Sequence, residues 1–287
     1  MGESSTRQLG AAAATLAAAA VGVGLGYLLA RSGDRPSLRD IASPYPAEDE
    51  PAWLTEAAAA QQQAVGSSSA AAAAPSGTLF AHAVSTCSRR VLCVLEEAGV
   101  DFAFRPVNLL LGEQRRADHL ARHPFGKVPA WQGADGLALF ESRAIMRHVA
   151  EGSALVPSGR AERALMEQWI SVEYSYFAPS FLPIYFMRVL KKMPLDEAKC
   201  AEHAAALAPT LDLLERRLGE SAHLAGPDFS LADLTFLCYF AQFANCGLQP
   251  AVYQRPKLAE WWAACSSRPA WKLAMSPPEV LQRAVSK

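Results

Sequence analysis

Two short stretches of the sequence combine a strand-breaking proline with polar residues in a pattern that could bind a peptide. In the first, a turn leads into a strand in which Val128 is followed at once by Pro129. Because proline cannot donate to a sheet ladder, this pair marks a sheet edge, a bulge or a cis peptide bond. The second places Glu141 and Ser142 in the first turn of a helix, where they complement exposed backbone N–H groups and the positive helix end. Together the two loops predict a groove at the edge of a small sheet, able to hold a short peptide in extended form.

The elements that would position these loops follow one another between residues 78 and 152. Short strands are predicted at 78–81, at 101–107, around 128 and at 137–140. Helices are predicted at 89–98, 112–122 and 142–150. Apolar residues at helical spacing support the first of these helices, and Gly99 is a natural stop for it. The resulting order, β-α-β-α-β-β-α, is typical of a thioredoxin-like domain, which we place at 78–155.

After residue 160 the predicted elements are helices. The longest spans 161–191 and is apolar on one side, with kinks expected at Pro179 and Pro183. A second amphipathic helix spans 195–218, and Gly219 is expected to end it. These lengths and patterns predict an all-α bundle over 160–275.

A helix start is also encoded further along the chain. Ser230 and Asp233 have the S-x-x-D spacing of a capping box, and Phe229 is placed as its hydrophobic staple. Both polar residues are therefore predicted to be structural, with a cost of about 1 kcal/mol or more when Asp233 is lost. The segments 256–267 and 269–271 close the predicted bundle, and a polar tail occupies 276–287.

The beginning of the chain has the pattern of an anchor or a targeting segment. Residues 9–30 carry no charged side chain and are long enough to cross a bilayer as a helix, although they are mostly Ala and Gly. Arg7 precedes the segment, and Arg31, Arg35 and Arg39 follow it. The positive-inside bias then places the rest of the chain in the cytosol. We predict a membrane anchor at 1–30, with a transit peptide for a plastid or another organelle and a cleaved secretory signal as alternatives.

Two further features concern this N-terminal part. Residues 31–77 are rich in Pro, Ala, Gln, Ser and acidic residues, and they can bury too little apolar surface to fold. They are predicted to form a disordered linker, the alternative being that Trp53 and Leu54 dock on the folded domain. Gly2 with Thr6 also matches the myristoylation pattern, which is short enough to occur by chance.

Composition excludes several other classes of protein. The net charge is −1 and the isoelectric point about 6.6, so no basic field indicates a nucleic-acid partner. The six cysteines are Cys87, Cys93, Cys200, Cys238, Cys246 and Cys265. They show no paired spacing, which favours free thiols in a reducing compartment over a disulfide framework or a zinc site. No metal site is predicted.

Four motifs, in one order and spacing, resemble those of a glutathione S-transferase, most closely the phi class. They are Ser85-x-x-x-x-Arg90, the run 112–116 (GEQRR), the run 124–130 (PFGKVPA) and the run 139–145 (LFESRAI). The resemblance extends from about residue 79 to about residue 274. It implies the two-part glutathione transferase fold, an α/β thioredoxin-like domain followed by an all-α helical bundle. It also implies glutathione as co-substrate and a homodimer.

The resemblance also implies which residues bind glutathione. Val128 would pair its backbone with the cysteinyl residue beside a cis Pro129, and Glu141 and Ser142 would hold the γ-glutamyl end. The glycyl carboxylate would be bound by Gln114, Arg115 and Lys127. The family more often has His at position 114 and Gln at position 127, so we expect altered affinity rather than loss. The alternative is that Arg115, Arg116 and Lys127 form a solvated surface.

Ser85 is the residue on which the implied chemistry depends. A thiol of pKa about 8.5 is only a few per cent ionised at pH 7, and lowering that pKa by ~2 units requires about 2.7 kcal/mol. A hydroxyl hydrogen bond to the anion contributes ~1.5–3 kcal/mol, and a helix N-terminus up to ~2 kcal/mol. Ser85 could thus stabilise the glutathione thiolate without a general base. The alternative role is helix capping, for which Thr86 and Ser88 would serve equally well.

The resemblance does not identify the electrophile, and two functions other than conjugation remain as alternatives. By resemblance, Tyr176, Phe177 and Phe181 would line an electrophile pocket opposite Val84, although aromatic stripes at this spacing are usually core. The predicted activity is conjugation of glutathione with hydrophobic electrophiles, and reduction of organic hydroperoxides is a second activity that the resemblance implies. The alternatives are a non-catalytic carrier that binds glutathione or other ligands, and a thiol transferase acting through Cys87, whose thiolate could be stabilised at the same helix end.

Overall fold

The computed structural model describes residues 77–276. The predicted anchor at 9–30, the linker and the tail lie outside this range, apart from the boundary residues 77 and 276. No helix in the described range is both long enough and apolar enough to span a membrane.

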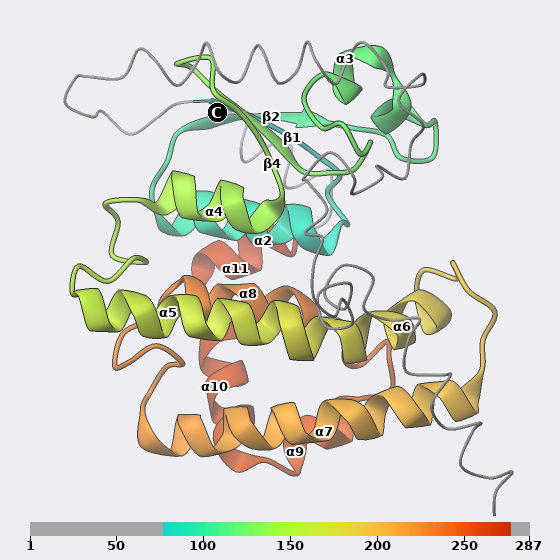
Figure 1. Cartoon of the computed structure of the whole chain (residues 1–287), viewed down its shortest axis with the longest axis vertical. Coiled ribbons are helices and arrows are strands. Elements are labelled where there is room, and N and C mark those ends of the chain that lie inside the picture. The colour runs from blue at the N-terminus through green and yellow to red at the C-terminus, as the bar shows by residue number, and fades with distance from the viewer. Residues whose placement is uncertain (1–76, 277–287) are drawn as a thin grey trace, which may run out of the picture. The chain divides into compact units, whose positions relative to one another are not determined.

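A four-stranded mixed sheet forms the first part of the described chain (Figure 1). The strands are β1 (Gly77–Ala81), β2 (Phe102–Pro106), β3 (Ala130–Gly133) and β4 (Ala138–Phe140). Their order is β2-β1-β3-β4, with β1 parallel to β2 and antiparallel to β3, and β4 antiparallel to β3. Leu79 and Trp131 are paired across β1 and β3, and both are completely buried. The sheet therefore has a packed face on the side to which these two residues point.

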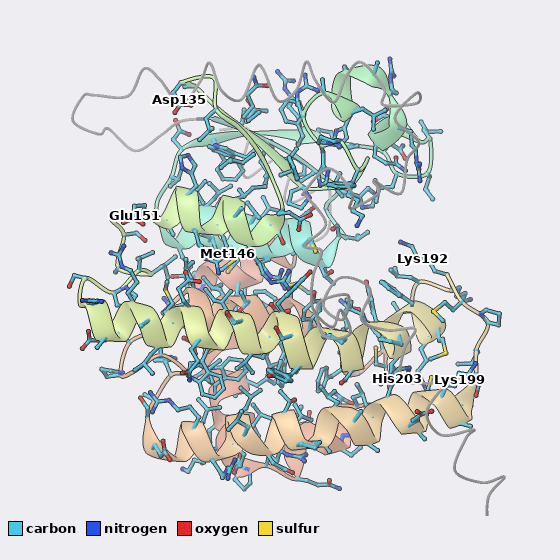
Figure 2. All side chains as sticks on the ribbon, in the orientation of Figure 1. Asp135, Met146, Glu151, Lys192, Lys199 and His203 are labelled. Atoms are coloured by element: carbon cyan, nitrogen blue, oxygen red, sulfur yellow. The ribbon has the colours of Figure 1, made fainter. Side chains whose placement is uncertain are left out.

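Two helices cover this sheet on the side of the helical part. They are α2 (Thr86–Glu97) and α4 (Ser142–Ala150), which pack against each other. Figure 1 shows both between the sheet and the helices that follow. Met146 of α4 lies on the side turned toward those helices and has no exposed surface (Figure 2). The prediction of a thioredoxin-like domain is confirmed in its order of elements.

The rest of the described chain is helical. Its elements are α5 (Arg160–Val172), the π-helical turn η2 (Glu173–Phe177), α6 (Ala178–Arg188), α7 (Glu197–Glu220), α8 (Leu231–Phe240), α9 (Gln249–Tyr253), α10 (Pro256–Ser266) and α11 (Pro269–Ala274). Every residue of α8 is buried, because α2, α5 and α10 pack around it. A helix that is apolar on all sides is expected at the centre of such a bundle. The predicted all-α second part is confirmed.

Three predicted elements differ from the structure. The helix expected at 112–122 is a short 3₁₀ turn, η1 (Glu113–Arg115), followed by α3 (Ala117–Leu120), because Gly112 is left-handed at φ 72° and Arg116 is extended. The long helix at 161–191 is interrupted by η2 and ends at Arg188, whereas Pro183 lies inside α6. The helix α7 continues through Gly219 to Glu220, so Gly219 is not its stop.

The capping box is formed as predicted. The Ser230 hydroxyl accepts from the Ala232 N–H, and the Asp233 carboxylate accepts from the Ser230 N–H at 3.0 Å. Asp233 also accepts from the Leu224 N–H at 3.1 Å and from the Trp261 indole at 2.8 Å. Asp233 therefore has two structural roles. It caps the N-terminus of α8, and it links the α7–α8 connection to α10.

Candidate functional site

The strand register brings the predicted site segments to one end of the sheet. Ala130 pairs with Phe80 of β1 and with Phe140 of β4, while Ala81 pairs with Pro106 of β2. The chain therefore leaves β1, β2 and β4 at the end where it enters β3. Three connections begin or end here: the β1–α2 connection carries Ser85, and the β4–α4 connection carries Glu141 and Ser142. The β2–β3 connection carries Gln114, Arg115, Lys127 and Val128.

The segment before β3 has the open backbone edge that the sequence indicates. The Val128–Pro129 peptide bond is cis, and Val128 is half-buried. Val128 forms no backbone hydrogen bond with another described residue. Its N–H and C=O are therefore available to pair with an extended peptide, which is how strand-like ligands are held at a sheet edge.

Two buried histidines lie behind this edge. The Nε2 atom of His119 is 2.7 Å from the carbonyl oxygen of Lys127. Because a carbonyl can only accept, Nε2 carries the hydrogen and donates it. The ring of His123 lies 5.1 Å from that of Phe140, and the Gly126 N–H donates to the His123 carbonyl at 2.8 Å. Neither histidine was among the predicted site residues.

The His123 environment keeps its ring neutral. Burial is the main cause, and the charges of His119 and Lys127 add to it, so that the pKa of His123 is lowered to about 4. The neighbouring turn is tightly packed, since Gly126 is left-handed at φ 56° and a Cβ there would lie 2.9 Å from the Gln114 carbonyl oxygen. Only glycine fits this approach without a backbone shift.

The residues expected at the glycyl carboxylate differ in exposure. Arg115 and Lys127 are exposed and form no ion pair with another described residue. The side-chain oxygen of Gln114 is buried and has no hydrogen-bond partner in the described chain. An unsatisfied buried amide is costly, so its unused bonding capacity is consistent with a ligand position.

The start of α4 holds Glu141 and Ser142 as predicted. Glu141 is exposed and sits at the N-cap with a left-handed φ of 68°, a conformation that non-glycine residues adopt mainly at constrained or functional positions. Ser142 is buried, and its hydroxyl accepts from Arg90 Nη1 at 3.1 Å. The Ser142 hydroxyl hydrogen is still available to donate.

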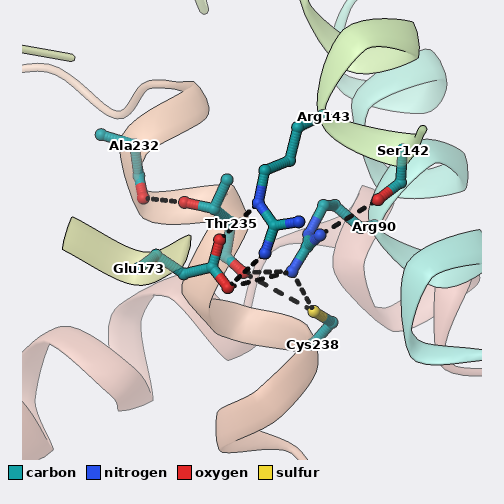
Figure 3. A network of polar contacts seen from close by, with 7 residues as sticks. All are labelled: Arg90, Ser142, Arg143, Glu173, Ala232, Thr235 and Cys238. Carbon is teal, nitrogen blue, oxygen red and sulfur yellow. Dashed lines mark hydrogen bonds and ion pairs between the residues drawn. The ribbon is translucent and has the colours of Figure 1, made fainter. Parts of the chain in front are cut away.

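A buried ion network supports this helix start (Figure 3). The carboxylate of Glu173, from η2, accepts two bonds from Arg143 at 2.7 and 2.6 Å and lies 3.6 Å from Arg90. Arg90 also donates to the Thr235 carbonyl at 2.9 Å. Glu173 was not among the predicted residues. Its signal in the sequence is that of a lone carboxylate four residues from both Trp169 and Phe177 on the apolar stripe.

Ser85 is the N-cap of α2. Its hydroxyl oxygen accepts from the Ser88 N–H at 3.3 Å, and its side chain is half-buried. The structure therefore assigns the cap to Ser85 rather than to Thr86 or Ser88. Capping uses a lone pair of the oxygen and leaves the O–H free to donate, so a cap can also stabilise an anion. Cys87, the second residue of α2, is half-buried with a free thiol.

The predicted electrophile pocket needs a correction. Val84 and Tyr176 are 51% and 64% exposed, but Phe177 and Phe181 have no exposed surface. The Phe177 ring lies 5.2 Å from that of Phe236 in α8, and Phe181 lies 5.2 Å from Tyr239. Their assignment to an accessible pocket is therefore wrong. The two phenylalanines are four residues apart on the stripe that packs against α8, so they belong to the core.

A group of potential metal ligands occurs elsewhere in the described chain. Single ligand atoms of His223, Asp233 and Cys265 lie within 4.8 Å of one another. The Asp233 carboxylate already accepts the hydrogen bonds of the capping box and of Trp261, and burial raises the pKa of the Cys265 thiol. A committed carboxylate and a thiol that resists ionisation do not favour a cation.

Two family models match the chain. The first, Glutathione S-transferase, N-terminal domain, matches residues 75–151, and the second, Glutathione S-transferase, C-terminal domain, matches residues 177–269. The curated relatives include glutathione S-transferase PM239X14 of Arabidopsis thaliana, 38% identical over 197 residues, covering 65% of this chain and 89% of the relative. Glutathione S-transferase 3 of Zea mays is 38% identical over 192 residues, covering 64% and 86%.

Solved structures agree with these matches. Glutathione transferase F7 from Populus trichocarpa has a TM-score of 0.66 and 34% identity, covering 70% of this chain and all of that one. Glutathione S-transferase I from maize, in complex with an atrazine glutathione conjugate, has a TM-score of 0.65 and 31% identity, covering 70% and 99%.

Proposed function

Because the chain belongs to the glutathione S-transferase family and is most similar to its plant phi class, we propose that it conjugates glutathione with hydrophobic electrophiles. The observation that carries the proposal is the common end of the sheet. At this end, the unpaired backbone of Val128 lies at the same sheet edge as the N-termini of α2 and α4, which carry Ser85 and Ser142. The maize relative was solved with a glutathione conjugate bound, which agrees with this class of reaction.

Each part of glutathione has a matching group at this end. The cysteinyl residue pairs with the Val128 backbone beside Pro129, and the γ-glutamyl end binds at Glu141 and Ser142. The glycyl carboxylate binds Gln114, Arg115 and Lys127, which together supply donors and positive charge. The chemistry assigned here to the chain's own residues requires no metal ligand.

The Ser85 hydroxyl donates to the glutathione sulfur at the N-terminus of α2, which lowers the thiol pKa. The thiolate then forms a bond to the electrophilic carbon, and the leaving group departs with the electron pair of the bond that breaks. With an organic hydroperoxide, the thiolate attacks the terminal oxygen, the O–O bond breaks, and the other oxygen takes up a proton and leaves as the alcohol, so that glutathione becomes a sulfenic acid. A second glutathione then gives the disulfide and water.

The test of Ser85 is its replacement by alanine. We expect Ser85→Ala to raise the pKa of bound glutathione by about 1–2 units and to lower kcat/KM with 1-chloro-2,4-dinitrobenzene by roughly 10–100-fold. Ser171→Ala, at an exposed position on α5, is the control. Unchanged turnover in Ser85→Ala would remove this mechanism.

The two competing functions give different results in the same experiments. A carrier binds immobilised glutathione but turns over no electrophile. A thiol transferase acting through Cys87 shows disulfide reductase activity that Cys87→Ser loses and Ser85→Ala keeps.

We further propose that 78–155 and 160–275 are the two domains of each subunit in a homodimer. Exposed aromatic side chains at Phe125 and Tyr174 support an interface on the described part. Sedimentation equilibrium measures the mass directly, and a monomer at micromolar concentration would contradict the dimer.

The N-terminal segment is proposed to anchor the protein in a membrane with the folded part in the cytosol. The uncharged run at 9–30, followed by three arginines, supports this placement. N-terminal sequencing of the mature protein from fractionated cells separates the possibilities. An intact N-terminus in the membrane fraction is expected, and a start site after residue 30 would instead identify a removed targeting peptide.

A further inference from the structure

Arg89 lies one helical turn after Ser85 and reaches two other elements. Its backbone N–H donates to the Ser85 carbonyl at 2.9 Å, as part of the first turn of α2. Its Nε donates to the Ala83 carbonyl at 2.8 Å, and Nη1 contacts the Met275 sulfur at 3.5 Å. The half-buried side chain thus extends from the β1–α2 loop to the residue that follows α11.

The charge of Arg89 is not balanced by an acidic partner. No ion pair within residues 77–276 includes Arg89, whereas its neighbour Arg90 faces the Glu173 carboxylate. The titratable groups that interact with Arg89 are His82 and Tyr185. Burial lowers the pKa of His82 and raises the pKa of Tyr185, so both are neutral near pH 7.

A half-buried guanidinium without a counter-ion is unusual. The loss of hydration lowers the pKa of Arg89, because no nearby anion compensates for it. A methionine sulfur is a weak acceptor, and Nη2 has no acceptor in the described chain. The Arg89 side chain therefore has both a charge and donor capacity that an anionic ligand could satisfy.

The Arg89 guanidinium lies beside residues expected to face the electrophile rather than beside those proposed to bind glutathione. The peptide-binding groups Val128 and Ser142 lie at the sheet edge and at the α4 start. Arg89 instead bonds the residue before Val84, the exposed side chain predicted to face the electrophile. Its other neighbours, Tyr185 and Met275, belong to the helical part.

We propose that Arg89 is a specificity-determining residue that selects electrophiles bearing a carboxylate. This inference rests on the proposed conjugation activity. The carboxylate of the electrophile accepts hydrogen bonds from Nη1 and Nη2, replacing the weak sulfur contact, while Nε stays on the Ala83 carbonyl. The thiolate stabilised at Ser85 then bonds to the ring carbon of an aryl chloride, and chloride leaves with the bonding pair.

The experiment compares two electrophiles that differ by one carboxylate. They are 4-chloro-3,5-dinitrobenzoate and 1-chloro-2,6-dinitrobenzene, each assayed with glutathione and the full chain. For Arg89→Gln we expect kcat/KM for the benzoate to fall at least tenfold relative to the neutral compound. Arg89→Lys keeps the charge and should recover part of the preference. Arg105→Gln removes an exposed charge on β2 and should leave the ratio unchanged.

Other outcomes overturn the assignment. Equal losses for both electrophiles would show that Arg89 acts on the thiolate or on folding, and the pKa of bound glutathione, measured by thiolate absorbance, would identify the first case. An unchanged ratio in Arg89→Gln would also exclude the proposal. Failure of the conjugation reaction itself appears separately, as absent turnover of both compounds by the unsubstituted protein.

Discussion

A hydrogen bond between the His119 imidazole and the Lys127 carbonyl positions the strand edge at which glutathione is proposed to bind. His119 is nearly completely buried, and its Nε2 hydrogen is bonded to the Lys127 carbonyl, immediately before Val128. This bond turns the Lys127 carbonyl toward the protein interior. Because the His119 ring bonds a backbone carbonyl, its effect on binding would act through the backbone.

Removing that donor should weaken glutathione binding specifically. In His119→Leu the Lys127 carbonyl loses its partly buried hydrogen bond, and we expect KM for glutathione to rise by roughly 5–20-fold. The KM of the electrophile should stay constant. His119→Gln keeps an N–H donor and should restore most of the binding. Equal effects of Leu and Gln would contradict the assigned bond.

The neutral ring of His123 predicts a loss of stability in acid. Its pKa is about 4 in the folded protein, against about 6.5 in the unfolded chain, so the unfolded state binds more protons between these values. The stabilisation is complete above pH 6.5 and decreases as the pH falls toward 4. Between pH 7.5 and pH 5, the free energy of unfolding should fall by about 2 kcal/mol from this group alone.

Urea unfolding at the two pH values measures this loss. The matched control is His123→Asn, which retains a polar side chain without a titrating group. The variant should lose less stability than the unsubstituted protein over the same pH interval. An identical pH dependence in both proteins would show that another group is responsible.

At the scale of secondary-structure elements, the Arg90–Glu173–Arg143 network joins helices from both parts of the chain. Glu173 is in η2, Arg90 in α2 and Arg143 in α4, and the Thr235 carbonyl belongs to α8. Figure 3 shows both guanidinium groups directed toward the same carboxylate. The start of α4, which carries Ser142, is thereby tied to the helical part.

Removing the shared carboxylate should be strongly destabilising. Glu173→Gln leaves two arginines without their counter-charge, and breaking a buried ion pair in this way costs about 3–5 kcal/mol. The control is Glu167→Gln, which breaks a partly exposed pair between Glu167 of α5 and Arg147 of α4 and should cost about 0–1 kcal/mol. Chemical denaturation measures the free energy of unfolding of both variants. Similar losses of this free energy would show that the burial of Glu173 does not set the cost.

At the scale of the whole described chain, the sheet-containing part and the helical part share an apolar interface. Helix α2 packs against α8 and α11, and Glu97 of α2 forms a two-bond ion pair with Arg268 at 2.6 Å for each bond. Such an interface makes it costly for either part to unfold while the other stays folded.

We therefore expect one cooperative unfolding transition. Trp131 in β3 is a buried reporter of the sheet, whereas far-UV circular dichroism is dominated by the helices. A variant with phenylalanine at Trp53 and at the four tryptophans of the helical part isolates the Trp131 signal. The two probes should give coincident urea midpoints, and a separation of the midpoints would show that the parts unfold independently.

The sequence by itself determined the features that depend on neighbouring residues. The capping box at Ser230 and Asp233, the helix start at Glu141 and the strand-edge proline at 129 are all local, because a few adjacent side chains and backbone groups decide them. The motif resemblance then identified the family from their order. The position of Ser85 before its helix was predicted in the same way.

Only the tertiary structure decided which faces of the helices meet. Phe177 and Phe181 have the spacing of an apolar stripe, and that spacing is the same whether the stripe lines a pocket or packs against α8. The partners of Glu173, His119 and Arg89 are residues far along the chain or backbone carbonyls, and the neighbouring residues in the sequence do not identify them. Long-range packing, and with it the burial of charge, sets these contacts after the local elements have formed.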